Sequence, residues 1–193
     1  MLVLKGKISK GIQVASGIAK KCNDIVDDLG NIIKRGQYRG GTIKLQRWAM
    51  RNDPMGRKKY LDLAELLEEM EIYNGTINVK LNDYLILDPK KCEWVVRNLY
   101  WDFHTIESFT YARARLRILK SGKEYDCFLY RPHCSKLSEH PRDIVEVLAP
   151  KIDGVKYNDE VEILVDKEKV KDIGVFDKIK LKVSGGDSPE LDT

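Results

Sequence analysis

The chain alternates apolar and polar residues over several short segments, a pattern that is typical of β-strands with one buried face. The alternation is strictest in residues 76–81, where every second side chain is apolar. A Ser-Gly-Lys turn at residues 121–123 predicts a hairpin between two of the other segments. The pattern predicts further strands over residues 3–10, 106–119, 125–131, 143–149, 161–165 and 177–183.

Two longer segments place their apolar residues at helical spacing. Residues 60–72 form the stronger pattern, with leucines on one face and acids on the other. Residues 19–34 form the weaker one, because Gly30 interrupts it, and Gly36 is expected to end it. Between the two helices, residues 42–48 are predicted to form a short strand.

Many short strands with few helices predict a mainly β fold of the α+β class, closed or nearly closed into a barrel. A chain of 193 residues is long enough for one substantial domain. We assign residues 1–183 to that domain, with a helical and basic insertion at about residues 19–72. Residues 184–193 are rich in Gly, Ser, Pro and acids and are expected to form a disordered tail.

The composition limits the ligands and the cellular location that we expect for the protein. The net charge of +4 permits a phosphate-bearing ligand without requiring nucleic acid. No apolar run approaches the ~20 residues that span a bilayer, and the first residues lack a signal-peptide core, so we expect a cytoplasmic protein with no membrane partner. The four cysteines form no Cys-x-x-Cys pair and are expected to be reduced thiols, in a spacing that fits no zinc site.

The polar face of residues 76–81 carries the first candidate chemistry. Thr76 and Asn78 place two neutral oxygens on one face, and Lys80 follows two residues later. Neutral oxygens that leave room for water and phosphate oxygens suit Mg²⁺. The alternative is an ordinary polar strand face on a half-exposed sheet.

Two distant stretches carry a resemblance to a known family. Residues 75–78 read Gly-Thr-Ile-Asn, and residues 143–150 form an apolar strand with an internal Glu that ends in Ala-Pro. Residues 158–163 then read Asn-Asp-Glu-Val-Glu-Ile. In this order and spacing, the stretches resemble the archaeal-type CTP-dependent riboflavin kinases. The resemblance covers residues 4–19 and 72–166.

The resemblance implies a six-stranded cradle-loop barrel that transfers a phosphoryl group from CTP, with Mg²⁺, to a hydroxyl of riboflavin to give FMN. It implies that Thr76 and Asn78 are the metal ligands and that Glu146 and Ser135 contact the flavin. An acceptor other than riboflavin stays open, and the sequence names no general base. Nucleotide contacts are implied for the loop after the first strand and for two residues beyond the Ala-Pro pair, namely Lys10, Gly11, Ile12, Gln13, Val14, Ala15, Lys151 and Asp153.

The loop departs from the family pattern at two positions. Gln13 and Ala15 stand where the family has glycines that let the backbone approach CTP. The change at Gln13 is the larger one and puts the mode of nucleotide contact in doubt. The alternative is a plain loop that connects a strand to a helix.

Residues 34–59 concentrate positive charge, with nine basic residues and one acid. So many cations on one surface would repel one another unless an anion lies among them. We interpret the segment as a lid over the site, with Arg39, Arg47 and Arg51 as phosphate contacts. Two alternatives stay open: a solvated surface excursion, and a non-catalytic barrel that binds nucleic acid or another polyanion through this segment.

Overall fold

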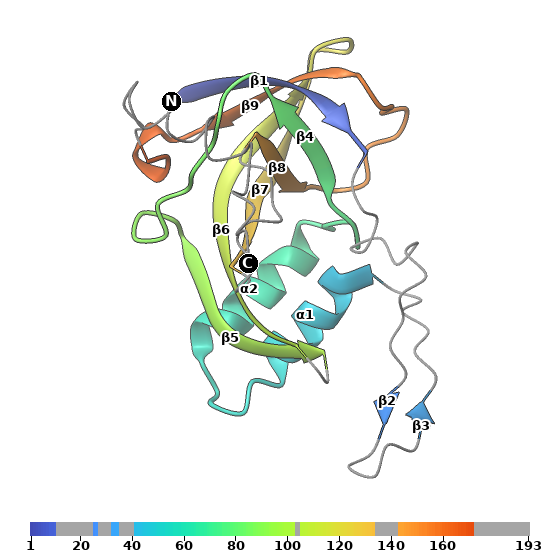
Figure 1. Cartoon of the computed structure of the whole chain (residues 1–193), viewed down its shortest axis with the longest axis vertical. Coiled ribbons are helices and arrows are strands. Elements are labelled where there is room, and N and C mark those ends of the chain that lie inside the picture. The colour runs from blue at the N-terminus through green and yellow to red at the C-terminus, as the bar shows by residue number, and fades with distance from the viewer. Residues whose placement is uncertain (11–24, 27–31, 35–40, 103–104, 134–142, 172–193) are drawn as a thin grey trace, which may run out of the picture.

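The fold is a seven-stranded antiparallel sheet with two helices against it (Figure 1). The computed structural model describes residues 1–10, 25–26, 32–34, 41–102, 105–133 and 143–171. The predicted mainly β class is therefore confirmed. The predicted strand at 177–183 and the tail at 184–193 lie outside the described residues.

Six strands of the sheet pair in a closed cycle. Its order is β6–β7–β8–β4–β1–β9, and β9 pairs back onto β6. β6 belongs both to this cycle and to the pair that it forms with the seventh strand, β5. Its residues 114–118 pair with β9, and its residues 105–111 pair with β5. The bounds of these strands are β1 Leu2–Ser9, β4 Ile77–Leu81, β5 Trp94–Asp102, β6 Thr105–Ile118, β7 Lys123–His133, β8 Ile144–Leu148 and β9 Glu160–Val165.

The apolar positions of the alternating segments fill the inside of this cycle. We call this group of buried side chains the ring core. Val79, Val147 and Ile163 belong to it and are fully buried, while their polar neighbours along each strand face outward. The alternation therefore predicted both the strands and their buried faces.

Gly6 lies in β1 where the strand comes closest to β4. A Cβ atom at this position would stand 2.5 Å from the backbone oxygen of Lys80 and 2.8 Å from Cγ1 of Val79. A backbone atom cannot move aside without shifting the strand, so this position requires glycine.

We expect Gly6→Ala to lower the free energy of unfolding by about 1–3 kcal/mol, the usual cost of overpacking a well-packed core. Urea unfolding measures this change. Lys5→Ala, at the exposed neighbouring position, is the matched control and should change stability little. Equal stability of the two variants would contradict the close approach.

Two helices cover the outer face of β5, β6 and β7. They are α1 Gly41–Arg51 and α2 Lys58–Glu69. Their apolar side chains, including Ile43, Leu63 and Leu67, pack with Phe109 and Phe128 of the strands in a second buried group, which we call the helix-side core. The helix predicted over residues 60–72 is confirmed with slightly different bounds.

The strand predicted over residues 42–48 is wrong, because these residues belong to α1. The alternation of Ile43 and Leu45 suggested a strand, but the buried positions are Ile43, Gln46, Ala49 and Met50, which follow helical spacing. Gln46 was the misleading residue, because it is polar and yet lies on the buried face.

The helix predicted over residues 19–34 is also contradicted where the structure describes the segment. Residues Ile25–Val26 form β2 and residues Ile32–Lys34 form β3, and the two strands pair antiparallel. The run of Ile and Val at these positions favours strand over helix. The rest of the segment lies outside the described residues.

The alternation of apolar and polar residues does not reveal β5. Its inward positions are Val96 and Leu99, three residues apart, because the register with β6 shifts between them. Asn98 occupies the extra position with a φ of 50° and donates its backbone N–H to the Ser108 hydroxyl at 3.0 Å. The irregularity hides the period-two pattern by which strands are found in a sequence.

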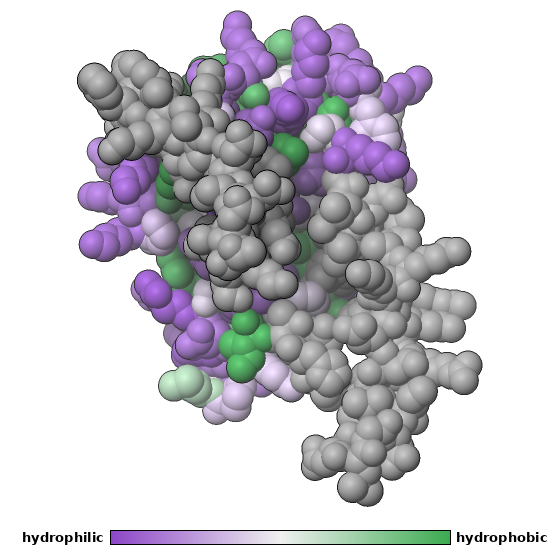
Figure 2. Space-filling view, viewed as in Figure 1, coloured by the Kyte–Doolittle hydropathy of each residue, from purple (hydrophilic) through white to green (hydrophobic). Residues whose placement is uncertain are grey.

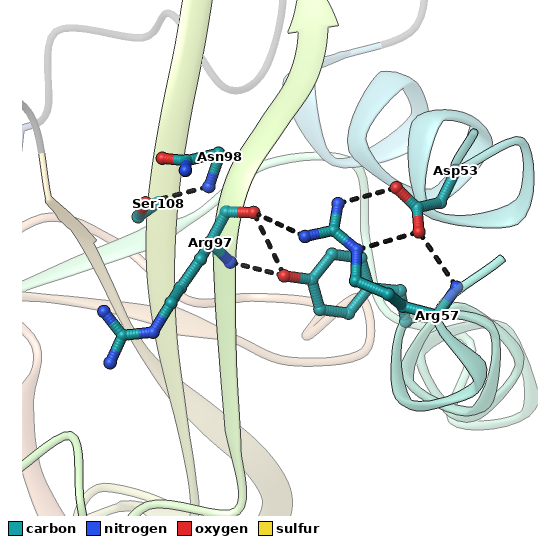
Figure 3. A network of polar contacts seen from close by, with 6 residues as sticks. Asp53, Arg57, Arg97, Asn98 and Ser108 are labelled. Atoms are coloured by element: carbon teal, nitrogen blue, oxygen red, sulfur yellow. Dashed lines mark hydrogen bonds and ion pairs between the residues drawn. The ribbon is translucent and has the colours of Figure 1, made fainter. Parts of the chain in front are cut away.

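A polar network covers the outer edge of β5 (Figure 3). The Tyr60 hydroxyl donates to the Arg97 carbonyl at 3.0 Å and accepts from the Arg97 N–H at 2.6 Å. Arg57 also donates to that carbonyl, at 3.1 Å, and donates through its Nε to Asp53 at 2.8 Å. The Arg57 hydrogen bond lowers the pKa of Asp53 to about 2. The network satisfies backbone groups at an edge that no other described strand covers.

The described surface is strongly charged around the closed cycle. Figure 2 shows hydrophilic side chains gathered over the upper part of the molecule, where β1, β9 and the β6–β7 turn lie. Ion pairs run across these strands, as between Arg117 and Glu162 at 2.8 Å.

Among the described residues, no helix has the length and apolar character needed to cross a bilayer.

Candidate functional site

A row of paired residues crosses four neighbouring strands. Asn78 of β4 lies opposite Glu146 of β8, Glu146 lies opposite Tyr130 of β7, and Tyr130 lies opposite Tyr111 of β6. Residues directly opposite each other in antiparallel strands project from the same face. Both tyrosines belong to the helix-side core, so the row faces α1 and α2 rather than the ring core.

Glu146 is the unusual member of the row. Its side chain is half-buried, and this desolvation raises its pKa to about 7. The nearby Glu107 carboxylate raises the pKa further, while the positive charge of Arg131 lowers it. The structure therefore places a carboxyl group that changes its charge near neutral pH beside Asn78. Glu146 is not the solvated strand acid that its residue type would suggest.

Gln46 of α1 ties the helix to this row. Its side chain is 1% exposed, and its Nε2 donates to the Tyr130 hydroxyl at 2.9 Å. Its Oε1 accepts a hydrogen bond from the Tyr111 hydroxyl at 3.2 Å. Burial raises the pKa of Tyr130 well above its ordinary value, so both tyrosines act as neutral hydrogen-bonding groups. The network fixes α1 over the strand that pairs with Glu146.

Arg47, the next residue of α1, contacts the segment of the chain that leads into β4. Its guanidinium donates to Oδ1 of Asn74 at 3.2 Å, two residues before Thr76. Burial lowers the pKa of Arg47, and the charge of Arg51 adds to this effect. Of the three arginines proposed as phosphate contacts, Arg47 thus lies near the candidate metal ligands. Arg39 lies outside the described residues.

Arg51 and other cations of residues 34–59 already have acidic partners. Arg51 pairs with Glu68 of α2, Arg57 pairs with Asp53 at 2.6 Å, and Lys58 pairs with Asp62 at 2.7 Å. The expectation that these cations require an external anion is wrong for the paired residues, because it counted only the acids within the segment. α2 supplies the missing acids. The predicted phosphate contact of Arg51 stays a prediction.

The two stretches that carry the family resemblance lie side by side. Tyr73 donates its backbone N–H to the Ala149 carbonyl at 2.9 Å, and Ile72 forms a bridge with Pro150. Lys151 and Asp153 follow directly and form an exposed ion pair at 3.2 Å. Lys151 thus follows directly on a bridge that lies four residues before Thr76, and the predicted nucleotide contacts of Lys151 and Asp153 stay predictions.

The start of the proposed nucleotide loop is also near. Ser9, the last residue of β1, lies opposite Asn78, and its hydroxyl donates to the Asn78 carbonyl at 3.4 Å. Lys10 follows and is exposed. Residues 11–15 and Ser135 lie outside the described residues, so their predicted contacts stay predictions.

The donor set around Asn78 suits Mg²⁺. Thr76 and Asn78 are half-buried and offer neutral oxygens, and the Glu146 carboxyl lies one strand away. Mg²⁺ favours such a sparse oxygen set because it keeps waters and binds phosphate oxygens. Among the described residues, no three His, Cys, Asp or Glu side chains gather into a metal-binding group. The residues present thus fit a hard, weakly held cation rather than zinc.

Several residues of this region were missed in the sequence. Only helix packing brings Gln46 to the site, and only strand register brings in Arg131 and the pair of Thr110 with His133. The single local signal was the Tyr-Arg-Pro-His run at residues 130–133, whose charged and titratable side chains interrupt an apolar strand.

No protein-family model matches the chain, and no curated protein sequence matches it significantly.

Proposed function

We propose that this protein is a Mg²⁺-dependent phosphotransferase that uses CTP as donor and a hydroxyl-bearing small molecule, riboflavin by default, as acceptor. The observation that carries the proposal is the pairing of Asn78 with Glu146 on one half-buried face, with Thr76 on the same face of β4. The resemblance to riboflavin kinases at both stretches supplies the donor and the acceptor. The cyclic pairing of six strands supports a cradle-loop barrel as the scaffold.

The chain's residues divide the work of phosphoryl transfer among them. Thr76 and Asn78 would hold Mg²⁺, which neutralises charge on the transferring phosphate when it is bound. Glu146 accepts the proton of the acceptor hydroxyl as that oxygen bonds to the γ-phosphorus. The bond from phosphorus to the leaving nucleoside diphosphate breaks in the same transfer. A carboxyl group with a pKa near 7 suits a proton acceptor at neutral pH.

A panel of nucleoside triphosphates tests this function. With Mg²⁺ and riboflavin, CTP should give CDP and a riboflavin product heavier by one phosphoryl group. CTP should also raise the melting temperature more than ATP, GTP or UTP, since a ligand at 100 times its Kd adds about 2.7 kcal/mol. Equal shifts with all four triphosphates would contradict CTP preference. Phosphoryl transfer to no acceptor in a screen of hydroxyl compounds would refute the function.

Arg47 and Arg51 form a natural pair of variants for the lid interpretation. Arg47→Gln should weaken CTP binding about 10-fold, because it removes a partly desolvated cation beside the approach to Thr76. Arg51→Gln is the control, because Arg51 lies four residues along the same helix and is already paired with Glu68. Calorimetric titration of each variant with CTP and Mg²⁺ measures the difference. Equal affinities in the two variants would remove α1 from the nucleotide site.

A further inference from the structure

A cavity of about 550 Å³ lies between α2 and the paired strands β6 and β7. Leu66 and Met70 of α2, together with Pro150, form an apolar wall. Arg113 of β6 and Asp126 of β7 line the same cavity and are exposed. A cavity of this size, with an apolar wall and a few charged groups, is typical of sites for small molecules.

Arg113 is held away from the acids of β7. Its guanidinium lies over the Trp94 ring of β5, on the other side of β6, at 5.3 Å from the ring centroid. Trp94 is itself fixed by an edge-to-face contact with Phe128, with 5.7 Å between the ring centroids. The nearby Glu93 carboxylate accepts from the backbone N–H of Arg113 at 3.0 Å and pairs with Lys169. Among the described residues, no acid pairs with the Arg113 guanidinium.

Asp126 also has no basic partner in the described part of the chain. Its direct neighbour across the strands is Arg115, which is the cation best placed to pair with it. Arg115 instead pairs with Glu124 at 2.7 Å, and Arg117 pairs with the same carboxylate. One cation and one carboxylate of this strand pair are therefore left over, and both line the cavity.

The register of β6 with β7 sets the spacing of these two charges. Arg113 lies opposite Phe128 and Asp126 lies opposite Arg115, so Arg113 and Asp126 are diagonal neighbours on one face. Diagonal neighbours stand about 7–8 Å apart. The stacking on Trp94 keeps the guanidinium from closing this distance. Two extended residues of a peptide span about 7 Å, so the two ends of a dipeptide match the spacing, whereas a single amino acid is too short.

We propose that this cavity binds a dipeptide-sized zwitterion with apolar side chains. The Arg113 guanidinium binds the carboxylate of the ligand, and the Asp126 carboxylate accepts hydrogen bonds from its ammonium group. Leu66, Met70 and Pro150 contact the side chains of the ligand and remove their apolar surface from water. The cavity shares no residue with the proposed phosphotransferase site, so the inference does not rest on the proposed function.

Calorimetric titration of the whole chain with leucyl-leucine tests the site, without nucleotide or Mg²⁺. Arg113→Gln and Asp126→Asn should each weaken binding about 10-fold, as expected for loss of a charged hydrogen bond. Arg117→Gln is the matched control, because Arg117 lies on the same face of β6 and pairs with Glu124 and Glu162. It should bind leucyl-leucine like the parent. Glycyl-glycine keeps both charges without the apolar side chains and should bind at least ~10-fold more weakly.

Blocked ligands assign each end of the dipeptide to its residue. Leucyl-leucine amide lacks the carboxylate, so it should bind the parent and Arg113→Gln with equal affinity. N-acetyl-leucyl-leucine lacks the ammonium group, so it should bind the parent and Asp126→Asn with equal affinity. Both blocked ligands should bind the parent about 10-fold more weakly than leucyl-leucine does.

Three outcomes would overturn the proposal. The first is no binding of leucyl-leucine at ~10 mM, where a ligand with a Kd of about 1 mM would nearly saturate the site. The second is equal affinity in the parent, Arg113→Gln and Asp126→Asn, or equal weakening by Arg117→Gln. The third is that both blocked ligands bind the parent as tightly as leucyl-leucine, which would leave no role for the two charges. Arg113 and Asp126 are exposed, so their variants should fold like the parent.

Discussion

Alanine at Asn78 should reduce Mg²⁺-dependent phosphoryl transfer by ~100- to 1,000-fold, because the metal loses one of its few protein ligands. Such a loss corresponds to about 3–4 kcal/mol of transition-state stabilisation. Asn78 lies directly opposite Glu146 in the paired row, so its amide projects from the same face as the proposed proton acceptor. Steady-state release of CDP measures the effect.

The neighbouring strand positions supply the controls for this experiment. Thr76→Ala should show a similar loss, since Thr76 lies on the same face. Lys80→Ala changes the next position on that face, where the side chain is exposed and pairs with Asp143 at 3.6 Å. It should leave transfer within a few-fold of the parent. Near-normal turnover in both the Asn78 and Thr76 variants, with circular dichroism unchanged, would remove the metal site from this face.

The sequence was a good guide to the strands that surround the ring core. In β4 and in residues 112–118 of β6, the apolar residues face the ring core and the polar residues face outward, so a period of two follows directly from one buried face. The hairpin turn at Gly122, with a φ of 68°, was equally readable from residue type. In these segments, local pattern and burial agree, because the environment differs only between the two faces.

The pattern failed where polar residues are buried. Gln46 lies in the helix-side core because two tyrosine hydroxyls satisfy its amide, and those tyrosines come from strands far along the chain. A periodicity that counts Gln as an exposed residue therefore assigns a strand to residues 42–48 instead of a helix. Asn98 hides β5 in a similar way, by adding one residue to the strand.

The sequence allowed the candidate ligands of the site to be predicted, but not the pKa values of its residues. Thr76, Asn78 and Glu146 could be named from two motifs, and the register of β4 with β8 brings Asn78 and Glu146 together. The raised pKa of Glu146 depends on burial under the helices and on Glu107, which no local pattern contains. The ion pair of Arg51 could not be read from the sequence for the same reason, because its partner Glu68 lies on another helix.

Glu146→Gln should change the pH dependence of stability as well as lower turnover. Glu146 has a folded-state pKa of about 7, above the ordinary 4.5. Below about pH 4.5 the carboxyl is protonated in both folded and unfolded chains, so parent and variant should be equally stable. Between the two values the unfolded chain ionises first, so the parent loses stability as pH rises. Above pH 7 the deficit should level off at about 3 kcal/mol relative to the variant.

Urea unfolding at pH 5, 6, 7 and 8, without Mg²⁺ or nucleotide, measures this difference. Glu160→Gln is the control, because Glu160 is an exposed acid on β9 that pairs with Lys7 at 3.5 Å. The stability difference between the parent and Glu146→Gln should grow with pH, and the difference for Glu160→Gln should stay flat. The experiment is independent of catalysis, so it tests the burial of the carboxyl group even if the phosphotransferase proposal fails. Parallel curves for the parent and Glu146→Gln would mean that Glu146 is solvated and too acidic to accept a proton efficiently at neutral pH.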